Sequence, residues 1–234
     1  MSSETRTKGI VIDVKDYREY DKILTIFTYD LGVIKAVIRG VKKSTAKSRF
    51  AGQLFCFVDL IMSKHGDMYT IINADLIESF FELAYNYDNY ILAVDIIKVI
   101  KYVSKYNPNS TELFVVFISI LNVLMNTKAN SNVVYLKFLV ETLKSMGYKH
   151  GWNTCERCGN PVDKTGYIDI FTGMVVCEKC NKPGMIVVDV NDMNIIKSVA
   201  ECDYASLEDI SIEEEQGIRI LKTVQALFKV HCNQ

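Results

Sequence analysis

Two Cys-x-x-Cys pairs constrain this chain more than any other feature of its 234 residues. Cys155 and Cys158 form the first pair, and Cys177 and Cys180 form the second after 18 intervening residues. Each pair can wrap one side of a cation through a tight turn, and Gly159 follows the first pair where such a turn often needs a left-handed residue. Four thiolates make a closed tetrahedral shell, so the spacing predicts one structural Zn²⁺ ion per chain.

Other chemistries for these cysteines are weaker. They could be reduced thiols in a core, but two complete pairs favour a metal. A thioredoxin-type pair opens a helix after a strand of a parallel sheet, and the sequence shows no such unit. A catalytic zinc keeps an open position beside a general base, whereas no His-x-Glu element lies near the cysteines. Replacement of one cysteine ligand by His150 stays open as a minor alternative.

Charge is distributed unevenly along a chain that is nearly neutral in total, with 27 basic and 28 acidic residues. No acidic residue occurs between Asp30 and Asp59, and this window contains a basic loop that begins at Gly40. Binding of phosphates needs positive charge spread over several ångströms on a mobile segment, so the window predicts a nucleic-acid or other anion site. A solvated loop is the alternative. The candidate residues are Lys35, Arg39, Lys42, Lys43, Lys47 and Arg49.

Short segments rich in β-branched and aromatic residues fill the N-terminal third of the chain. The expected strands are residues 10–14, 23–29, 33–38, 54–62 and 68–72. Five short strands within about 65 residues predict a small closed barrel, because closure removes exposed strand edges. Four aromatic residues could stack on bases, although a place in the core is favoured for each. These are Phe50, Phe55, Phe57 and Tyr69.

After residue 75 the apolar pattern takes the period of a helix, and further helices are expected at about 192–201 and 212–232. The apolar stretch 113–125 is shorter than the roughly 20 residues that span a bilayer, so a buried helix is expected there. The N-terminus lacks the apolar run of a signal peptide, which predicts a soluble, cytosolic protein without a membrane partner. The expected domains are a barrel at 1–80, helical parts at 81–149 and 187–234, and a zinc element at 150–186.

The sequence gives no positive sign of an enzyme. It lacks the glycine-rich loop of nucleoside-triphosphate enzymes, the dinucleotide-binding motif and the nucleophile elbow of hydrolases. Carboxylates are plentiful, but their spacing marks none as catalytic.

Several runs of residues match a known group of bacterial proteins. The N-terminal runs include T-K-G-I-V-I, Y-D-K-I-L-T-I-F-T and R-G-V-K-K, and the later runs frame the cysteines as C-E-R-C-G and G-M-V-V-C-E-K-C. Their order and spacing hold over nearly the whole chain. The matching residues are 7–12, 20–28, 32–36, 39–43, 47–50, 146–148, 155–159 and 173–180. In these runs the chain resembles the RecO family of recombination mediators.

The resemblance implies an α+β fold, with a five-stranded OB-type barrel before a helical domain that contains a four-cysteine zinc element. It implies binding of single- and double-stranded DNA, and annealing of complementary strands without ATP. It also implies work with RecR and with the C-terminal tail of single-strand-binding protein, so that RecA loads at gaps. The implied location is the cytoplasm, at the nucleoid during repair. Lys35 and Arg39 fall on basic positions that the family uses for DNA.

One departure concerns residues 17–20, which are Tyr-Arg-Glu-Tyr where many members have Tyr-Gly-Glu. Two other classes of function stay open beside the resemblance. A zinc-ribbon adaptor would bind a protein, for example a transcription component, and would not anneal DNA. A redox protein would use the cysteine pairs and would hold no stable zinc.

Overall fold

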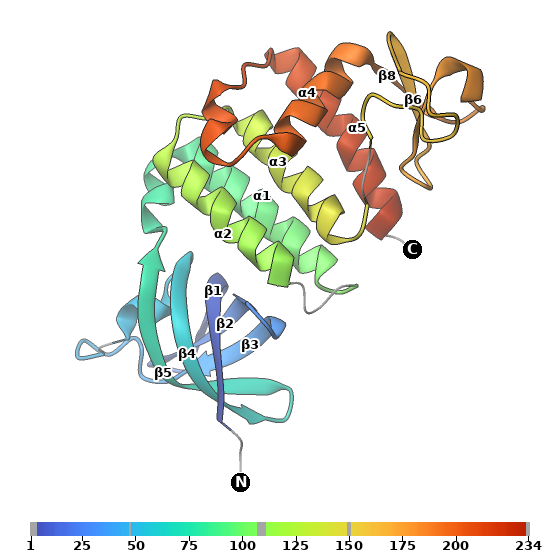
Figure 1. The fold of residues 1–234 in the computed structure, drawn as a ribbon. Helices are drawn as coiled ribbons and strands as arrows, with labels where there is room; N and C mark the ends of the chain where they lie inside the picture. The colour runs from blue at the N-terminus through green and yellow to red at the C-terminus, as the bar shows by residue number, and fades with distance from the viewer. Residues whose placement is uncertain (1–3, 47, 107–110, 149–150, 233–234) are drawn as a thin grey trace. The chain divides into compact units, whose positions relative to one another are not determined.

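A computed structural model of the chain describes residues 4–46, 48–106, 111–148 and 151–232. The fold is α+β, with five N-terminal strands followed by a largely helical part (Figure 1). The chain divides into two compact units, residues 1–125 and 126–234. The four-part domain division expected from the sequence stays a prediction.

The five strands of the first unit close into a barrel, as predicted. They are β1 (Glu4–Tyr17), β2 (Asp21–Thr28), β3 (Gly32–Ile38), β4 (Cys56–His65) and β5 (Met68–Ser79). β1 pairs antiparallel with β2 and β4, β2 with β3, and β4 with β5. The seam between β3 and β5 is parallel and joins two residue pairs, Ala36 with Tyr69 and Val37 with Thr70.

β1 and β5 are longer than the sequence predicted. The pairing of β1 with β2 shifts register between Val11 and Asp13, and the pairing of β4 with β5 shifts twice. Such irregularities increase the local bend and twist, so a long strand can stay paired as it curves around the barrel. They also interrupt the alternation of polar and apolar residues from which strand ends are predicted.

Side chains that alternate along the strands fill the barrel. In β3, Ile34, Ala36 and Ile38 are buried while Lys35 is exposed, as the two-residue period of a strand requires. Burial of each large apolar side chain stabilises the fold by about 1.5–3 kcal/mol. Fully buried members of this core are Val11, Leu24, Ile26, Val58, Leu60 and Met62.

Two helices complete the first unit after the short 3-10 turn η2 (Phe81–Tyr85). They are α1 (Tyr87–Val103) and α2 (Thr111–Asn126). Asn86 caps α1 by accepting a hydrogen bond from the Asn89 amide at 3.1 Å. The Phe114 ring of α2 lies 5.4 Å from that of Phe27. The stretch 113–125 is therefore part of a packed helix, as predicted, and none of the described helices combines the length and hydropathy that crossing a bilayer requires.

In the second unit, three short strands that form a small sheet follow one helix in the sequence and precede two others. Its elements are α3 (Ser131–Ser145), β6 (Thr165–Ile168), β7 (Val175–Val176), β8 (Ile186–Asp189), α4 (Val190–Glu201) and α5 (Glu214–Cys232). The strands are antiparallel in the order β7-β6-β8. Helix α3 packs against both α4 and α5. The two predicted C-terminal helices are thus confirmed, each with its start displaced by two residues.

Buried charged groups join these helices. The ammonium of Lys137, which is 3% exposed, pairs with Glu141 at 3.0 Å and donates to the carbonyl oxygen of Cys202 at 2.8 Å. Asp192 is also 3% exposed, and it accepts two hydrogen bonds from the Arg219 guanidinium at 2.7 and 2.8 Å. Because a buried charge is costly unless it is paired, these contacts fix α3 to the end of α4 and α4 to α5.

Candidate metal centre and nucleic-acid interface

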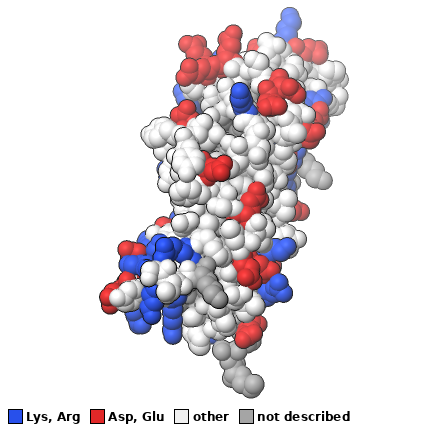
Figure 2. Space-filling model, turned by 90° about the vertical axis from the view of Figure 1, so that its left-hand side faces the viewer, with Lys and Arg blue, Asp and Glu red and all other residues white. Residues whose placement is uncertain are grey.

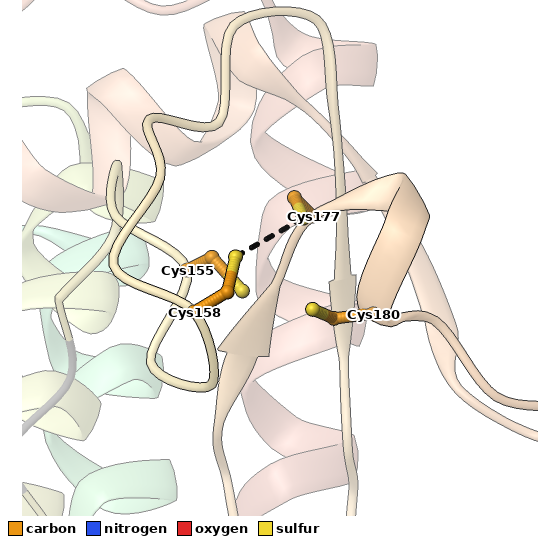
Figure 3. Close-up of side chains that lie close together, drawn as sticks. All are labelled: Cys155, Cys158, Cys177 and Cys180. Atoms are coloured by element: carbon orange, nitrogen blue, oxygen red, sulfur yellow. Dashed lines mark hydrogen bonds between the residues drawn. The ribbon is translucent and has the colours of Figure 1, made fainter.

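The first cysteine pair lies in a tight turn. An isolated bridge between Thr154 and Pro161 closes this turn, and the Cys155 amide donates to the carbonyl oxygen of Asn160 at 2.8 Å. Gly159 has a φ of 75° and its amide donates back to the Cys155 carbonyl, so the left-handed residue expected from the sequence is present. The turn directs both thiols toward the second pair (Figure 3).

The second pair follows the end of β7. Cys177 comes directly after that strand, and Cys180 ends the short 3-10 turn η3 (Glu178–Cys180). The four sulfur atoms lie within 4.8 Å of one another, and those of Cys158 and Cys177 are 3.7 Å apart. Among the described residues these thiols form the one group of ligand-type side chains close enough to share a metal ion.

The thiols differ in their protonation. Burial disfavours the Cys155 thiolate, but the backbone amides of Cys177, Cys158 and Arg157 outweigh it and lower the pKa of Cys155 to about 6. A side-chain hydrogen bond with Cys158, followed by burial, raises the pKa of Cys180 to about 12. Four neighbouring thiols cannot all ionise against their mutual repulsion, whereas a cation at their centre stabilises every thiolate. The donor set therefore fits a metal ion bound by sulfur alone.

Four of the predicted anion-site residues, Arg39, Lys42, Lys43 and Arg49, lie in a loop that we call the basic loop and define as residues 39–49. Lys35 projects from β3 on the outer face, and Arg39, Lys42, Lys43 and Arg49 are all exposed. Figure 2 shows basic side chains gathered over the barrel on the face toward the viewer. Lys47 lies outside the described residues.

Two contacts shape the basic loop. The Arg49 guanidinium donates to the carbonyl oxygen of Lys43 at 3.1 Å, which folds the loop back on itself. Lys42 lies 3.3 Å from Asp16, which neutralises part of its charge. Thus the segment between Asp30 and Asp59 contains no acidic residue, but the fold brings an acidic residue from another segment, Asp16, next to it.

Comparisons with known proteins cover both of these regions. The family described as Recombination protein O N terminal matches residues 1–80, and the family described as Recombination protein O C terminal matches residues 84–234. The chain belongs to the RecO family. RecO membership gives it a role in DNA repair and recombination.

Individual relatives agree with this. The DNA repair protein RecO of Clostridium novyi (strain NT) is 27% identical over 219 residues, which cover 94% of this chain and 86% of that protein. The DNA repair protein RecO of Acetivibrio thermocellus is 25% identical over 226 residues, or 96% and 90% of the two chains. That of Clostridium perfringens is 26% identical over 221 residues, or 94% and 89%.

In this RecO-family chain the structure brings other residues to the basic loop that the sequence analysis missed. The turn between β1 and β2 contributes Arg18 and Tyr20, which line a hollow together with Arg39 and Lys43. No local pattern marks them, because their place beside the loop depends on the pairing of β2 with β3. Among the aromatic residues considered for base stacking, Phe55 is buried, and its ring lies 5.9 Å from that of Tyr90 in α1.

Proposed function

We propose that this RecO-family protein binds single- and double-stranded DNA through the basic loop and anneals complementary strands without ATP. The observation that carries the proposal is the row of exposed cations, Lys35, Arg39, Lys42, Lys43 and Arg49, on a closed barrel. Lys47 belongs to the same proposed surface by sequence. Exposed Lys and Arg neutralise phosphates of any sequence and displace condensed counterions.

The physics of the surface supports annealing in particular. Two complementary strands repel each other through their phosphates, and a basic surface that holds one strand loosely lowers that repulsion. Asn and Gln, which read base edges, are scarce in the loop window, where Gln53 is the single one. The bases of a bound strand would therefore stay available for pairing.

The barrel is proposed to be of the OB type. Its strand order β1-β2-β3-β5-β4, with β1 paired to β4, supports this assignment. OB barrels bind single strands on an open face, with basic grooves that follow the backbone. The boundaries 1–80, 81–149, 150–186 and 187–234 are proposed as the barrel, the first helical part, the zinc element and the second helical part.

The metal at the cysteine cluster is proposed to be one structural Zn²⁺ ion, held by Cys155, Cys158, Cys177 and Cys180. Tetrahedral Zn–S bonds of about 2.3 Å place sulfur atoms about 3.8 Å apart, and the 3.7 Å between Cys158 and Cys177 supports this fit. A zinc ion in such a site supplies folding energy rather than a reaction centre, because four sulfur ligands leave no open position. The protein is accordingly proposed to be a mediator and not an enzyme.

Family membership supports a proposal for the partners and the location of the protein. The chain is proposed to act with RecR and with the C-terminal tail of single-strand-binding protein, so that RecA loads on gaps. The proposed location is the cytoplasm, at the nucleoid during repair.

A strand-annealing assay with the purified protein tests this function. Two complementary oligonucleotides, each labelled at one end, are mixed in low salt and without ATP. They should anneal faster with the protein than without it. The acceleration should fade as salt rises, because the contacts are to phosphates. A protein that holds zinc but neither binds nor anneals DNA would instead fit the zinc-ribbon adaptor, and thiol-dependent activity without zinc would fit the redox alternative.

A further inference from the structure

The turn between β1 and β2 forms a hollow with the start of the basic loop. The Lys42 amide donates to the carbonyl oxygen of Tyr20 at 3.1 Å, and the Gly40 amide donates to the Asp21 carboxylate at 2.8 Å. Two hydrogen bonds thus hold the turn and the loop together. The hollow between them has a volume of about 480 Å³.

Three cations and two carboxylates line this hollow. The cations are Arg18, Arg39 and Lys43, and the carboxylates are Glu19 and Asp21. Asp21 already accepts the Gly40 amide, and Glu19 accepts a hydrogen bond from the Tyr20 hydroxyl, which raises the pKa of that tyrosine. Both carboxylates therefore have partners, Glu19 within the turn and Asp21 in the basic loop, while the side chains of the cations reach toward solvent.

Arg18 adopts an unusual backbone conformation. Its φ is 54°, in the left-handed region that favours glycine and costs other residues roughly 1–2 kcal/mol. Its guanidinium lies over the Tyr17 ring, 5.0 Å from the ring centroid. Strained backbone conformations cluster at functional sites, so the strained Arg18 at the rim of this basic hollow points to a role in binding.

Tyr20 supplies an aromatic surface within the hollow. The residue is 43% exposed, and the Lys43 ammonium lies 5.5 Å from its ring centroid. An exposed ring among cations matches the two parts of a nucleotide, because a base stacks on the ring while the neighbouring phosphates meet the positive charges.

We propose that this hollow binds one nucleotide of single-stranded DNA, with its base stacked on Tyr20 and its flanking phosphates at Arg18 and Arg39. The proposal rests on the proposed DNA binding and adds a contact to the base. Lys43 then leaves the ring face and takes part in phosphate binding. Duplex DNA cannot use the stacking contact, since its bases are already stacked and paired.

Equilibrium binding of the full-length protein to three probes tests the stacking contact. The probes are an oligothymidylate, the same backbone with abasic sites throughout, and a duplex of equal length. Tyr20→Ala should weaken oligothymidylate binding about tenfold and leave the abasic and duplex affinities within about twofold of wild type. Tyr20→Phe, which keeps the ring, should restore the oligothymidylate affinity.

Tyr85→Ala is the matched control. Tyr85 is 79% exposed on the same unit, and no Lys or Arg occurs between His65 and Ile97. Its replacement should change none of the three affinities, because an exposed tyrosine without cations nearby in the sequence has no reason to hold a nucleotide.

Arg18→Gly tests the strained residue with a second measurement. Glycine relieves the left-handed conformation, so the melting temperature should rise, while oligothymidylate affinity should fall several-fold because a phosphate contact is lost. A gain in stability together with a loss in binding is a combination that a purely structural arginine would not give. Unchanged or improved binding would remove Arg18 from the proposed site.

The outcomes separate this inference from the proposed function. If the wild type binds oligothymidylate and Tyr20→Ala binds it equally well, the stacking contact is wrong and DNA binding stands. If Tyr20→Ala weakens all three probes alike, the residue supports the loop and does not contact a base, which also overturns the inference. If the wild type binds none of the probes, both the proposed function and the nucleotide site fail.

Discussion

Residues 126–234 and the basic loop of the barrel both depend on ionisable side chains, but they hold them in opposite ways. In residues 126–234, four thiols, of which Cys155 is buried, share a small volume, and the buried Lys137 pairs with Glu141. On the basic loop, the cations stand in solvent with few bonds among them. A change in the first region should therefore appear as lost stability, and a change in the second as lost affinity for DNA.

The largest effect should come from the cysteine cluster. Cys155→Ser removes a buried ligand of the proposed zinc ion. Structural zinc contributes about 10–16 kcal/mol of binding energy in small domains, so the unit of residues 126–234 should lose most of its stability. Zinc content by mass spectrometry and thermal unfolding would measure this. Cys202→Ser is the control, because Cys202 lies outside the cluster. If Cys155→Ser still held one zinc ion per chain, Cys155 would not be a needed ligand, and the contrast between this region and the basic loop would fail.

A smaller loss of stability should follow from Glu141→Gln. The change leaves the Lys137 ammonium buried without its counter-charge, and breaking a buried ion pair costs about 3–5 kcal/mol. Denaturant unfolding would measure the loss. Glu201→Gln serves as control, since Glu201 is exposed and lies 3.9 Å from Lys197; its cost should stay under about 0.5 kcal/mol. Equal effects would mean that Lys137 is satisfied by backbone carbonyls alone.

The same region should show a dependence on pH. Burial opposes the Asp192 carboxylate, but hydrogen bonds from Arg219 and Gln216 outweigh it and hold the pKa of Asp192 below its ordinary value. Stability from a lowered pKa is present above the unfolded value of about 3.9 and is lost as pH falls through the folded value. Asp192→Asn should cost about 2 kcal/mol near neutral pH and lose less stability than wild type as the solution is acidified below the unfolded value. Parallel losses in both proteins would exclude Asp192 as a source of acid sensitivity.

On the basic loop, the Lys42→Ala, Lys43→Ala double variant should weaken DNA binding without a loss of stability. With about four phosphate contacts on single strands, log K should fall against log salt with a slope of roughly −3, and removal of two contacts should bring it to about −1.5. The loss should be similar for unrelated sequences. Lys98→Ala on α1 is the control. An unchanged slope would place the DNA on another surface.

The smallest effect should come from Arg39→Lys, which keeps the charge. Arginine can give two hydrogen bonds to one phosphate and lysine cannot, so binding and annealing should weaken by a few-fold, and Arg39→Ala should cost more. Annealing rates at moderate salt would measure both. If Arg39→Ala annealed DNA as fast as wild type, Arg39 would have only a structural role at the end of the barrel.

The difference between the two regions also explains what could be predicted. The cysteine cluster was predictable to the residue, because each pair is local in sequence and thiols have a narrow range of partners. The barrel was predictable as five strands, while the register shifts that lengthen β1 and β5 leave no clear signal. Lys137 and Glu141 have the spacing of an ordinary surface pair on a helix. Their burial depends on α4, whose end arrives more than sixty residues later.

The basic loop was predictable only as a run of charge. The residues that shape it, Asp16, Arg18 and Tyr20, come from the end of β1 and the turn after it, about twenty residues earlier in the chain. The absence of acidic residues between Asp30 and Asp59 therefore predicted a basic surface correctly, but it predicted a larger positive charge than the folded surface carries. Contacts of this kind follow from which strands are neighbours, so they cannot be found before the topology is known.

The short parallel seam between β3 and β5 is the place where the barrel should open most easily. Two residue pairs close it, whereas β4 and β5 share ten, so local opening should begin there. The basic loop follows β3 directly in the chain, so a DNA strand held by the loop would restrain one side of the seam. Slower amide exchange at residues 36–37 and 69–70 in the presence of DNA would then report that restraint.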